Sequence, residues 1–239
     1  MSTEVKLSAR LAKLAEYVLP SKPFADIGTD HGLLPCFLLS NNICPRGIAS
    51  DKSVGPLQSA AQNAKLYEVG NKLELRRGDG LDILEPGEVS TIIIAGMGGD
   101  LINQILDRGI RKVLDETERF IIQPNVAAYR LRLWARENSW KIKEEELVKE
   151  GKIYYEIIIL EGRENERLRD EDMYLGPRLL EKKHSLLVPY WRERFKSESK
   201  VIDQMLREKK PELAQKAEQI IKKQERLKRE IECRLAVKM

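Results

Sequence analysis

Apolar residues first recur at helical spacing near the start of the chain. They follow one another at intervals of four, three and four from Leu7 to Val18. One face of a helix repeats in this way, so the spacing predicts an amphipathic helix over residues 6–19. Ser8 near its beginning and Pro20 at its end are suitable boundary residues.

Short apolar runs then alternate with helical patterns. The runs of strand length are residues 24–27, 47–50, 73–75, 91–95 and 120–123. The helical patterns between them cover residues 32–39, 56–67, 100–106 and 126–138. Strands that alternate with helices form right-handed crossovers, so we expect an α/β fold with a parallel sheet covered on both faces.

The pattern changes after Trp140. Residues 141–148 and 152–161 alternate between apolar and polar positions, and Glu150 and Gly151 between them form a turn signal. Two such strands with a tight connection predict a hairpin. The expected architecture is a Rossmann-like sheet of parallel strands with an antiparallel C-terminal hairpin.

The last quarter of the chain is predicted to be helical. Residues 163–173 are almost all charged, so we place a domain boundary there. Beyond it, apolar residues repeat at helical spacing on both sides of Pro211, which predicts two long helices that pack as an antiparallel, coiled-coil-like pair. Pro189 is expected to kink or divide the first helix. The predicted domains are residues 1–162 and residues 174–239.

Charge is distributed unevenly between these parts. The net charge of +4 combines +6 for residues 163–239 with −2 for residues 1–162. A basic segment favours a polyanionic partner, although a solvated helical face with mixed charges is an alternative interpretation.

Composition excludes several classes of protein. No apolar run approaches the length of a membrane-spanning helix, and residues 1–4 lack the order of a secretory signal. The three cysteines, Cys36, Cys44 and Cys233, form no CxxC pair. We therefore expect buried thiols, a reducing, cytoplasmic location, no metal site and no membrane partner.

The first predicted strand leads into a glycine-containing acidic turn. The sequence from Asp26 to Gly32 reads DIGTDHG. A dinucleotide site has a glycine where this chain has Asp30, and a carboxylate there would repel a pyrophosphate. This disfavours a nicotinamide-dependent dehydrogenase. An acidic turn instead suits a ligand with an ammonium group, such as an amino acid.

Three further strand ends carry polar or glycine-rich clusters. Asp51 lies 19 residues beyond Gly32, where a carboxylate can accept hydrogen bonds from ribose hydroxyls. Asp79 follows the third strand and could accept from an adenine amino group. The fourth strand ends in the sequence AGMGG at residues 95–99. Any one of these aspartates could be only a helix cap, but together they predict a ligand site at the carboxyl edge of the sheet.

These motifs resemble those of class I S-adenosylmethionine-dependent methyltransferases. DIGTDHG, AGMGG and the Gln123-Pro124-Asn125 triplet, in this order, are similar to the bacterial tRNA adenine-N1 methyltransferase family that modifies position 22. The resemblance spans essentially the whole chain, and a helical C-terminal appendage is also typical of that family. The Asp/Asn-Pro-Pro-aromatic tetrad of adenine amino-group methyltransferases is missing from this sequence, which disfavours amino-group methylation.

The resemblance implies a set of site residues. S-adenosylmethionine would be bound by Asp26, Gly28, Thr29, His31, Gly32, Asp51, Lys52, Gly78, Asp79, Gly80, Leu81, Ala95, Gly96 and Met97. The target base would lie beside Gly98, Gly99, Gln123, Pro124 and Asn125.

Adenine N1 has an in-plane lone pair, so methyl transfer to it depends mainly on proximity and orientation. A nearby carboxylate can stabilise the positive charge that develops on the base. Asp30 is the first candidate for this catalytic role, and His31 is the alternative. Because N1 is occupied in a Watson–Crick pair, the base must be unpaired or flipped out.

Basic residues on predicted helices are candidates for contact with tRNA phosphates. They are Arg10, Lys13, Arg130, Arg132, Arg136, Lys222, Lys223, Arg226, Lys228 and Arg229. Ordinary solvated helix faces would have the same composition. The three tryptophans are expected in the core. We expect a monomer or a homodimer.

Other functions remain open at this point. The cofactor fold could serve another RNA or a small molecule, although the basic helical segment disfavours a small molecule. A non-enzymatic RNA-binding module is the third hypothesis, and the retained aspartates of the predicted cofactor site disfavour it.

Overall fold

A computed structural model describes residues 4–113, 117–164, 166–208 and 210–239. Residues 1–3 lie outside the described residues, and they belong to the segment 1–4 in which no secretory signal was found. The chain divides into two compact units, Met1–Arg167 and Leu168–Met239. The predicted domain limits at residues 162 and 174 bracket this division.

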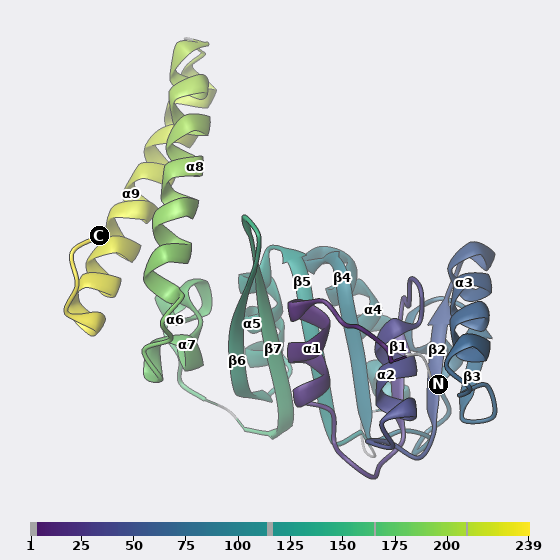
Figure 1. Ribbon diagram of the computed structural model, residues 1–239. Coiled ribbons are helices and arrows are strands. Elements are labelled where there is room, and N and C mark those ends of the chain that lie inside the picture. Colours follow the sequence, from purple (N-terminus) through teal and green to yellow (C-terminus); the bar gives the residue numbers. More distant parts are fainter. Residues whose placement is uncertain (1–3, 114–116, 165, 209) are drawn as a thin grey trace. The chain divides into compact units, whose positions relative to one another are not determined.

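The first unit is a seven-stranded sheet with helices on both faces (Figure 1). Its helices are α1 (Ala9–Glu16), α2 (Leu33–Ser40), α3 (Val54–Leu66), α4 (Gly99–Val113) and α5 (Ala128–Glu137), with a 3₁₀ turn at Gly80–Ile83. Its strands are β1 (Phe24–Ile27), β2 (Gly47–Asp51), β3 (Leu73–Arg77), β4 (Thr91–Gly98), β5 (Arg119–Val126), β6 (Trp140–Glu150) and β7 (Ile153–Arg163).

The strand order is β3-β2-β1-β4-β5-β7-β6. Strands β1 to β5 are parallel, and β7 is antiparallel to both β5 and β6. The predicted Rossmann-like sheet with an antiparallel hairpin is therefore confirmed. The order reverses between β1 and β4, and open α/β sheets bind ligands outside the carboxyl ends of strands at such a reversal.

Alternate residues of the central strands bury opposite faces of the sheet. Ile93 of β4 and Ile121 of β5 pack with residues of α1 and α2, such as Leu14 and Leu38, in one core cluster. The neighbouring Ile92 is also fully buried, which strand alternation places on the other face. Figure 1 shows α1 and α2 on the near side of the sheet and α4 and α5 on the far side.

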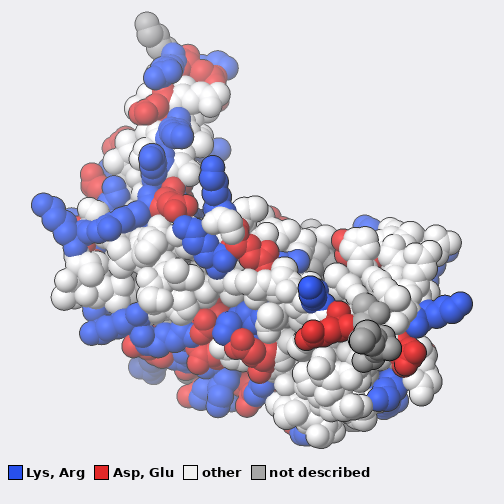
Figure 2. Space-filling view, viewed as in Figure 1, with Lys and Arg blue, Asp and Glu red and all other residues white. Residues whose placement is uncertain are grey.

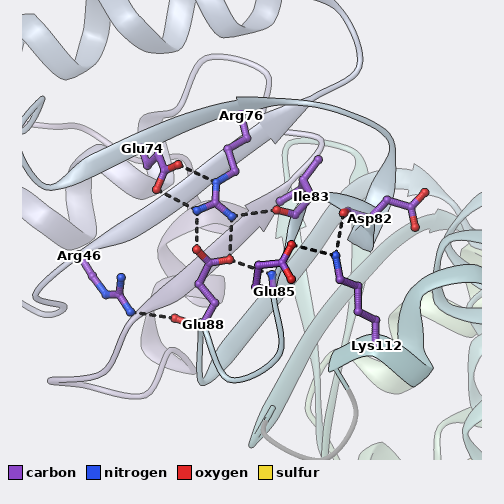
Figure 3. A network of polar contacts seen from close by, with 8 residues as sticks. All are labelled: Arg46, Glu74, Arg76, Asp82, Ile83, Glu85, Glu88 and Lys112. Atoms are coloured by element: carbon purple, nitrogen blue, oxygen red, sulfur yellow. Dashed lines mark hydrogen bonds and ion pairs between the residues drawn. The ribbon is translucent and has the colours of Figure 1, made fainter.

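Arg76 of β3 is the centre of a polar network beside the sheet (Figure 3). Its guanidinium donates hydrogen bonds to the carboxylates of Glu74 and Glu88. Lys112 of α4 donates to the carbonyl oxygen of Asp82 at 3.2 Å. These contacts fix the connection between β3 and β4 to its neighbours.

The second unit consists of helices in its described residues: α6 (Asp170–Leu175), α7 (Pro177–Glu181), α8 (Leu187–Arg207) and α9 (Pro211–Leu235). Helices α8 and α9 are the two long helices predicted around Pro211, and they pack against each other. Pro189 does not divide α8, because it lies in the first turn, where a proline removes no intrahelical hydrogen bond. Helices α6 and α7 were not predicted from the sequence.

Acidic residues in the first turn of α6 explain why a highly charged stretch forms a helix there. Glu171 pairs with Arg226 of α9 at 2.9 Å, and Asp172 pairs with Arg234 at 2.8 Å. Carboxylates also interact favourably with the amino-terminal end of a helix. Some charges of the stretch in which a domain boundary was predicted therefore form contacts between helices of the second unit.

Other expectations concern single residue types. Trp134, Trp140 and Trp191 are buried, as predicted, and so are Cys36 and Cys44. Cys233 is exposed on α9, so the prediction that all three thiols are buried is wrong for this residue. None of the described helices is long and apolar enough to cross a membrane.

Candidate functional site

A pocket of about 730 Å³ opens at the carboxyl ends of β1, β2 and β4. The acidic turn from residues 28 to 32 forms one wall, and Asp51 and residues 95–97 contribute from the neighbouring strands. Helix α1 and the β6–β7 hairpin complete the lining. The pocket lies where the topology predicts a ligand site.

The carboxylate of Asp26 lines this pocket at the end of β1, yet the residue is only 8% exposed. Burial raises the pKa of Asp26 to about 6, although a hydrogen bond from Thr29 and the positive charge of Arg10 act in the opposite direction. A buried carboxylate of this kind is poised to accept a cationic group.

Two glycines give the turn after Asp26 its shape. Gly28 and Gly32 have φ values of +75° and +65°, which side-chain-bearing residues rarely adopt. A Cβ atom on Gly32 would lie 2.9 Å from the Cβ of Ala60 in α3. Glycine at this position therefore permits both the turn and the close approach of α3.

Asp30 and His31 lie at the outer part of the pocket. Their side chains are 79% and 57% exposed, and His31 Nε2 lies 3.3 Å from Asp30 Oδ2. Both residues line the pocket, so either can face a ligand that enters it.

Asp51 lines the pocket at the end of β2 and accepts a hydrogen bond of 2.7 Å from the backbone N–H of Ser53. This bond fixes one carboxylate oxygen. The neighbouring Lys52 is exposed and is not among the lining residues.

The predicted adenine contacts lie outside the pocket lining. Asp79 pairs with Arg108 of α4 at 3.0 Å, and this partner lowers the pKa of its carboxyl group. Gly78 is half-buried, whereas Gly80 and Leu81 are buried beside α4. In this structure Asp79 is occupied by a guanidinium, so an adenine amino group would have to share or displace it.

A chain of hydrogen bonds joins α1 to the end of β4. Arg10 Nη1 donates to Gln123 Oε1 at 2.6 Å, and Gln123 Nε2 donates to Asn125 Oδ1 at 3.2 Å. Asn125 Nδ2 donates to the carbonyl oxygen of Gly96 at 2.7 Å. The β4–β5 pairing is irregular around Gly96, whose φ is +80°.

This chain of contacts corrects the prediction that Gln123 faces the base. Gln123 is fully buried and its amide is engaged at both ends, so it does not face a base as expected. Pro124 is also buried. Arg10, which was predicted to contact tRNA phosphates, lines the pocket. Asn125 is exposed and lines the pocket, in keeping with the expected position.

The other predicted base residues lie at the junction of β4 and α4, where Gly98 ends the strand and Gly99 begins the helix. Gly98 has space for a side chain, since an added Cβ would meet Val126 Cγ2 at 3.8 Å. On Gly99 the same atom would lie 2.8 Å from the carbonyl oxygen of Ala127. Neither glycine is among the lining residues of the pocket.

Several pocket residues were not predicted from the sequence as part of the site. They include Ser8 and Leu11 near α1, and Glu150 and Tyr155 of the hairpin. Arg10 Cζ lies 5.3 Å from the centroid of the Tyr155 ring, and the Arg10 backbone N–H donates to Glu150. No local motif marks these residues, because the contacts join segments about 140 positions apart.

Arg132 was predicted to contact phosphates, and this prediction is wrong. The side chain is 1% exposed and forms ion pairs with Glu145 and Glu156. Arg130 is exposed and pairs with Asp100, and Arg136 is half-buried. The side chain of Lys13 pairs with Glu16 at 2.6 Å.

The basic run of α9 divides into exposed and packed residues. Lys222, Arg226 and Arg229 are exposed. Lys223 and Lys228 lie over the rings of Tyr174 and Phe195, at 3.5 and 5.2 Å from the centroids. Figure 2 shows basic side chains interspersed with acidic ones over these helices. On the face shown, there is no unbroken basic surface.

Among the described residues, no group of three or more His, Cys, Asp or Glu side chains could hold a metal ion.

Comparisons with known proteins give one consistent result. The family model described as tRNA (adenine(22)-N(1))-methyltransferase matches residues 24–232. The Bacillus subtilis (strain 168) tRNA (adenine(22)-N(1))-methyltransferase is 32% identical over 207 residues, which cover 84% of this chain and 87% of that protein.

Solved structures agree with this result. The crystal structure of the B. subtilis M1A22 tRNA methyltransferase TrmK has a TM-score of 0.85 and 30% identity, covering 95% of this chain and 99% of that one. Streptococcus pneumoniae Sp1610 in complex with S-adenosyl-L-methionine has a TM-score of 0.78 and 32% identity, covering 83% and 92%.

Proposed function

Because the chain belongs to the tRNA (adenine(22)-N(1))-methyltransferase family, we propose that its pocket brings S-adenosylmethionine and an adenine of tRNA together for transfer of a methyl group to N1. The enzyme is a tRNA (adenine-N1)-methyltransferase that uses S-adenosylmethionine. The observation in this structure that carries the proposal is the buried carboxylate of Asp26 in a large pocket at the topological reversal of the sheet.

The pocket residues fit the cofactor. An α-ammonium group would compensate the buried Asp26 carboxylate, and the backbone of Gly28 and Gly32 allows close approach. The free oxygen of Asp51 can accept from ribose. When bound, the cofactor supplies a methyl group attached to a positively charged sulfur. Asp79 would bind adenine by sharing or exchanging its contact with Arg108.

The chain's own groups then have to orient the base and stabilise charge. Adenine N1 needs no deprotonation before it attacks, so positioning supplies most of the acceleration. Asp30 is our candidate for stabilising the positive charge that develops on the base. Its exposure of 79% makes this effect weak in water. The effect grows when a bound nucleotide excludes water from the turn.

We propose that the second unit contacts the tRNA backbone through exposed basic residues of α9. Residues 163–239 carry a net charge of +6. Lys222→Ala combined with Arg229→Ala should weaken tRNA binding and flatten the plot of log affinity against log salt by about 0.9 per lost phosphate contact. Filter binding at several salt concentrations measures this slope. An unchanged slope would remove α9 from the tRNA interface.

A direct assay tests the proposed reaction. Unmodified tRNA transcripts with adenine or guanine at position 22 are incubated with the enzyme and labelled S-adenosylmethionine, then digested to nucleosides. We expect 1-methyladenosine from the adenine-22 transcript and no labelled nucleoside from the other. Label in a different nucleoside, or in neither transcript, would contradict the proposal.

We propose a cytoplasmic location for the enzyme. We also propose that it is a monomer or a homodimer, and a mass measurement in solution distinguishes these two states.

A further inference from the structure

Arg10 reaches the pocket from a segment that the cofactor motifs of the sequence do not include. It comes from α1, which precedes the first strand of the sheet, yet its guanidinium lines the pocket and binds Gln123 of β5. We propose that Arg10 is a positioning residue that acts through Gln123 and, together with the carbonyl oxygen of Gly96, fixes the hydrogen-bonding direction of Asn125, so that the site selects the 6-amino group of adenine. This inference rests on the proposed function.

The two ends of the hydrogen-bond chain each fix the orientation of one amide. A guanidinium only donates hydrogen bonds, and a backbone carbonyl oxygen only accepts them. Arg10 therefore requires the oxygen of the Gln123 amide to face it, and the carbonyl oxygen of Gly96 requires the nitrogen of the Asn125 amide. Both amides between these ends have only one orientation that satisfies every partner.

The direction of the hydrogen bond between Gln123 and Asn125 follows from the directions of the other two bonds. With its oxygen toward Arg10, Gln123 presents its NH₂ group to Asn125, and Asn125 Oδ1 accepts at 3.2 Å. Gln123 is fully buried, so water cannot substitute for either partner. Rotation of one amide would place two acceptors or two donors against each other at its contacts.

The orientation of the Asn125 amide determines which of its atoms can meet a base in the pocket. This side chain is exposed and lines the pocket, and its oxygen keeps a second lone pair after it accepts from Gln123. An acceptor at this place matches the 6-amino group of adenine, which donates. It opposes the 6-oxo group of guanine, which accepts. Arg10 thus acts on the base through two intervening amides.

Tyr155 helps to hold the guanidinium. Arg10 Cζ lies 5.3 Å from the ring centroid, and the Arg10 backbone N–H donates to Glu150 on the same hairpin. The side chain is therefore held from both the hairpin and β5, as a fixed end of the chain has to be.

The test compares two tRNA transcripts that carry adenine or unsubstituted purine at position 22. Purine lacks the amino group and also has a less basic N1, so a single rate ratio mixes two effects. The change in that ratio between wild type and variant removes the basicity effect, because both enzymes meet the same bases. Assays use saturating cofactor at pH 8, where Asp26 is ionised.

Arg10→Met should lower the adenine-to-purine ratio of kcat/KM by about three- to tenfold, the size of one neutral hydrogen bond. Arg10→Lys keeps a group that only donates and should retain the ratio. Gln123→Glu preserves shape and the contact with Arg10 but offers only acceptors, so Asn125 must turn its nitrogen toward it. This variant should also lose discrimination. Lys6→Met, an exposed change before α1, is the matched control.

Thermal melting and calorimetric titration with S-adenosylmethionine accompany the kinetics. If Arg10→Met methylates both transcripts more slowly at an unchanged ratio, Arg10 binds cofactor or phosphate and the inference is wrong. If Arg10→Met fails to fold, the Gln123→Glu ratio decides, and an unchanged ratio there also overturns the inference. A wild-type enzyme that fails to methylate adenine 22 contradicts the proposed function itself, which separates the two failures.

Discussion

Cofactor binding should depend on pH through Asp26. In the free enzyme burial raises the pKa of this carboxyl group to about 6. Binding of the cofactor's ammonium group requires the ionised form, so protonation competes with binding. For a group of pKa 6, we expect the affinity for S-adenosylmethionine to be about tenfold lower at pH 5 than at pH 7, or about 1.4 kcal/mol.

The same group affects the stability of the free enzyme in the opposite direction to a salt-bridged carboxylate. Its folded pKa is higher than its unfolded value of 3.8, so the native state binds more protons between these two values. Stability contributed by Asp26 is therefore complete below pH 4 and falls as pH rises through 6, by about 3 kcal/mol in total. Bound cofactor should offset part of this loss.

Calorimetric titration at pH 5, 6 and 7 in two buffers of different ionisation enthalpy measures both affinity and proton release. Near pH 6 the wild type should release about half a proton on binding. Asp26→Asn should bind weakly and without this proton release. Other ionisable groups line the same pocket, so His31→Gln serves as the control for the imidazole. Equal affinities at pH 5 and pH 7 in the wild type would refute the assignment of Asp26 to the ammonium group.

Three further predictions test other parts of the first unit. Asp51→Ala should weaken cofactor binding at least tenfold in calorimetry with an unchanged melting temperature, since charged hydrogen bonds contribute about 1.5–3 kcal/mol each; unchanged affinity would exclude this residue from the site. Gly99→Ala should destabilise the protein by about 1–3 kcal/mol in urea unfolding, because the new Cβ meets backbone atoms. Gly98→Ala should destabilise it by less than about 0.5 kcal/mol, and equal effects of the two changes would contradict the packing argument. Arg132→Met should cost about 3–5 kcal/mol by leaving buried carboxylates such as Glu145 without their cation, while the salt slope of tRNA binding stays unchanged.

The sheet could be predicted from the sequence because its signals are local. Each parallel strand contains a short segment with apolar residues, β1 to β4 lead into glycine or aspartate, and the hairpin has alternation on both sides of Gly151. Helix α1 begins later than the predicted residue 6, because Ser8 caps its first turn through the N–H of Leu11, and it ends at Glu16, before the predicted residue 19. Helical periodicity predicts that a helix is present more accurately than it predicts where the helix begins and ends.

Basic residues show where sequence alone was insufficient. Arg130 and Arg132 are two positions apart on α5, so they point in different directions. Arg130 is exposed, whereas Arg132 is buried between two glutamates of the hairpin. The pattern of α5 alone contains no signal for this difference, because the burial depends on strands that follow later in the chain.

Only some residues of the candidate site could be predicted from the sequence, for the same physical reason. The acidic turn and Asp51 follow directly from their strands and could be read as a motif. Arg10 could not, because its role depends on a contact with Gln123, 113 positions away. A motif identifies groups that touch a ligand, while the direction in which an amide donates is set by its partners. In this pocket the cation that we propose sets that direction precedes the whole sheet, so the proposed determinants of specificity and of cofactor binding lie on separate segments that only the fold brings together.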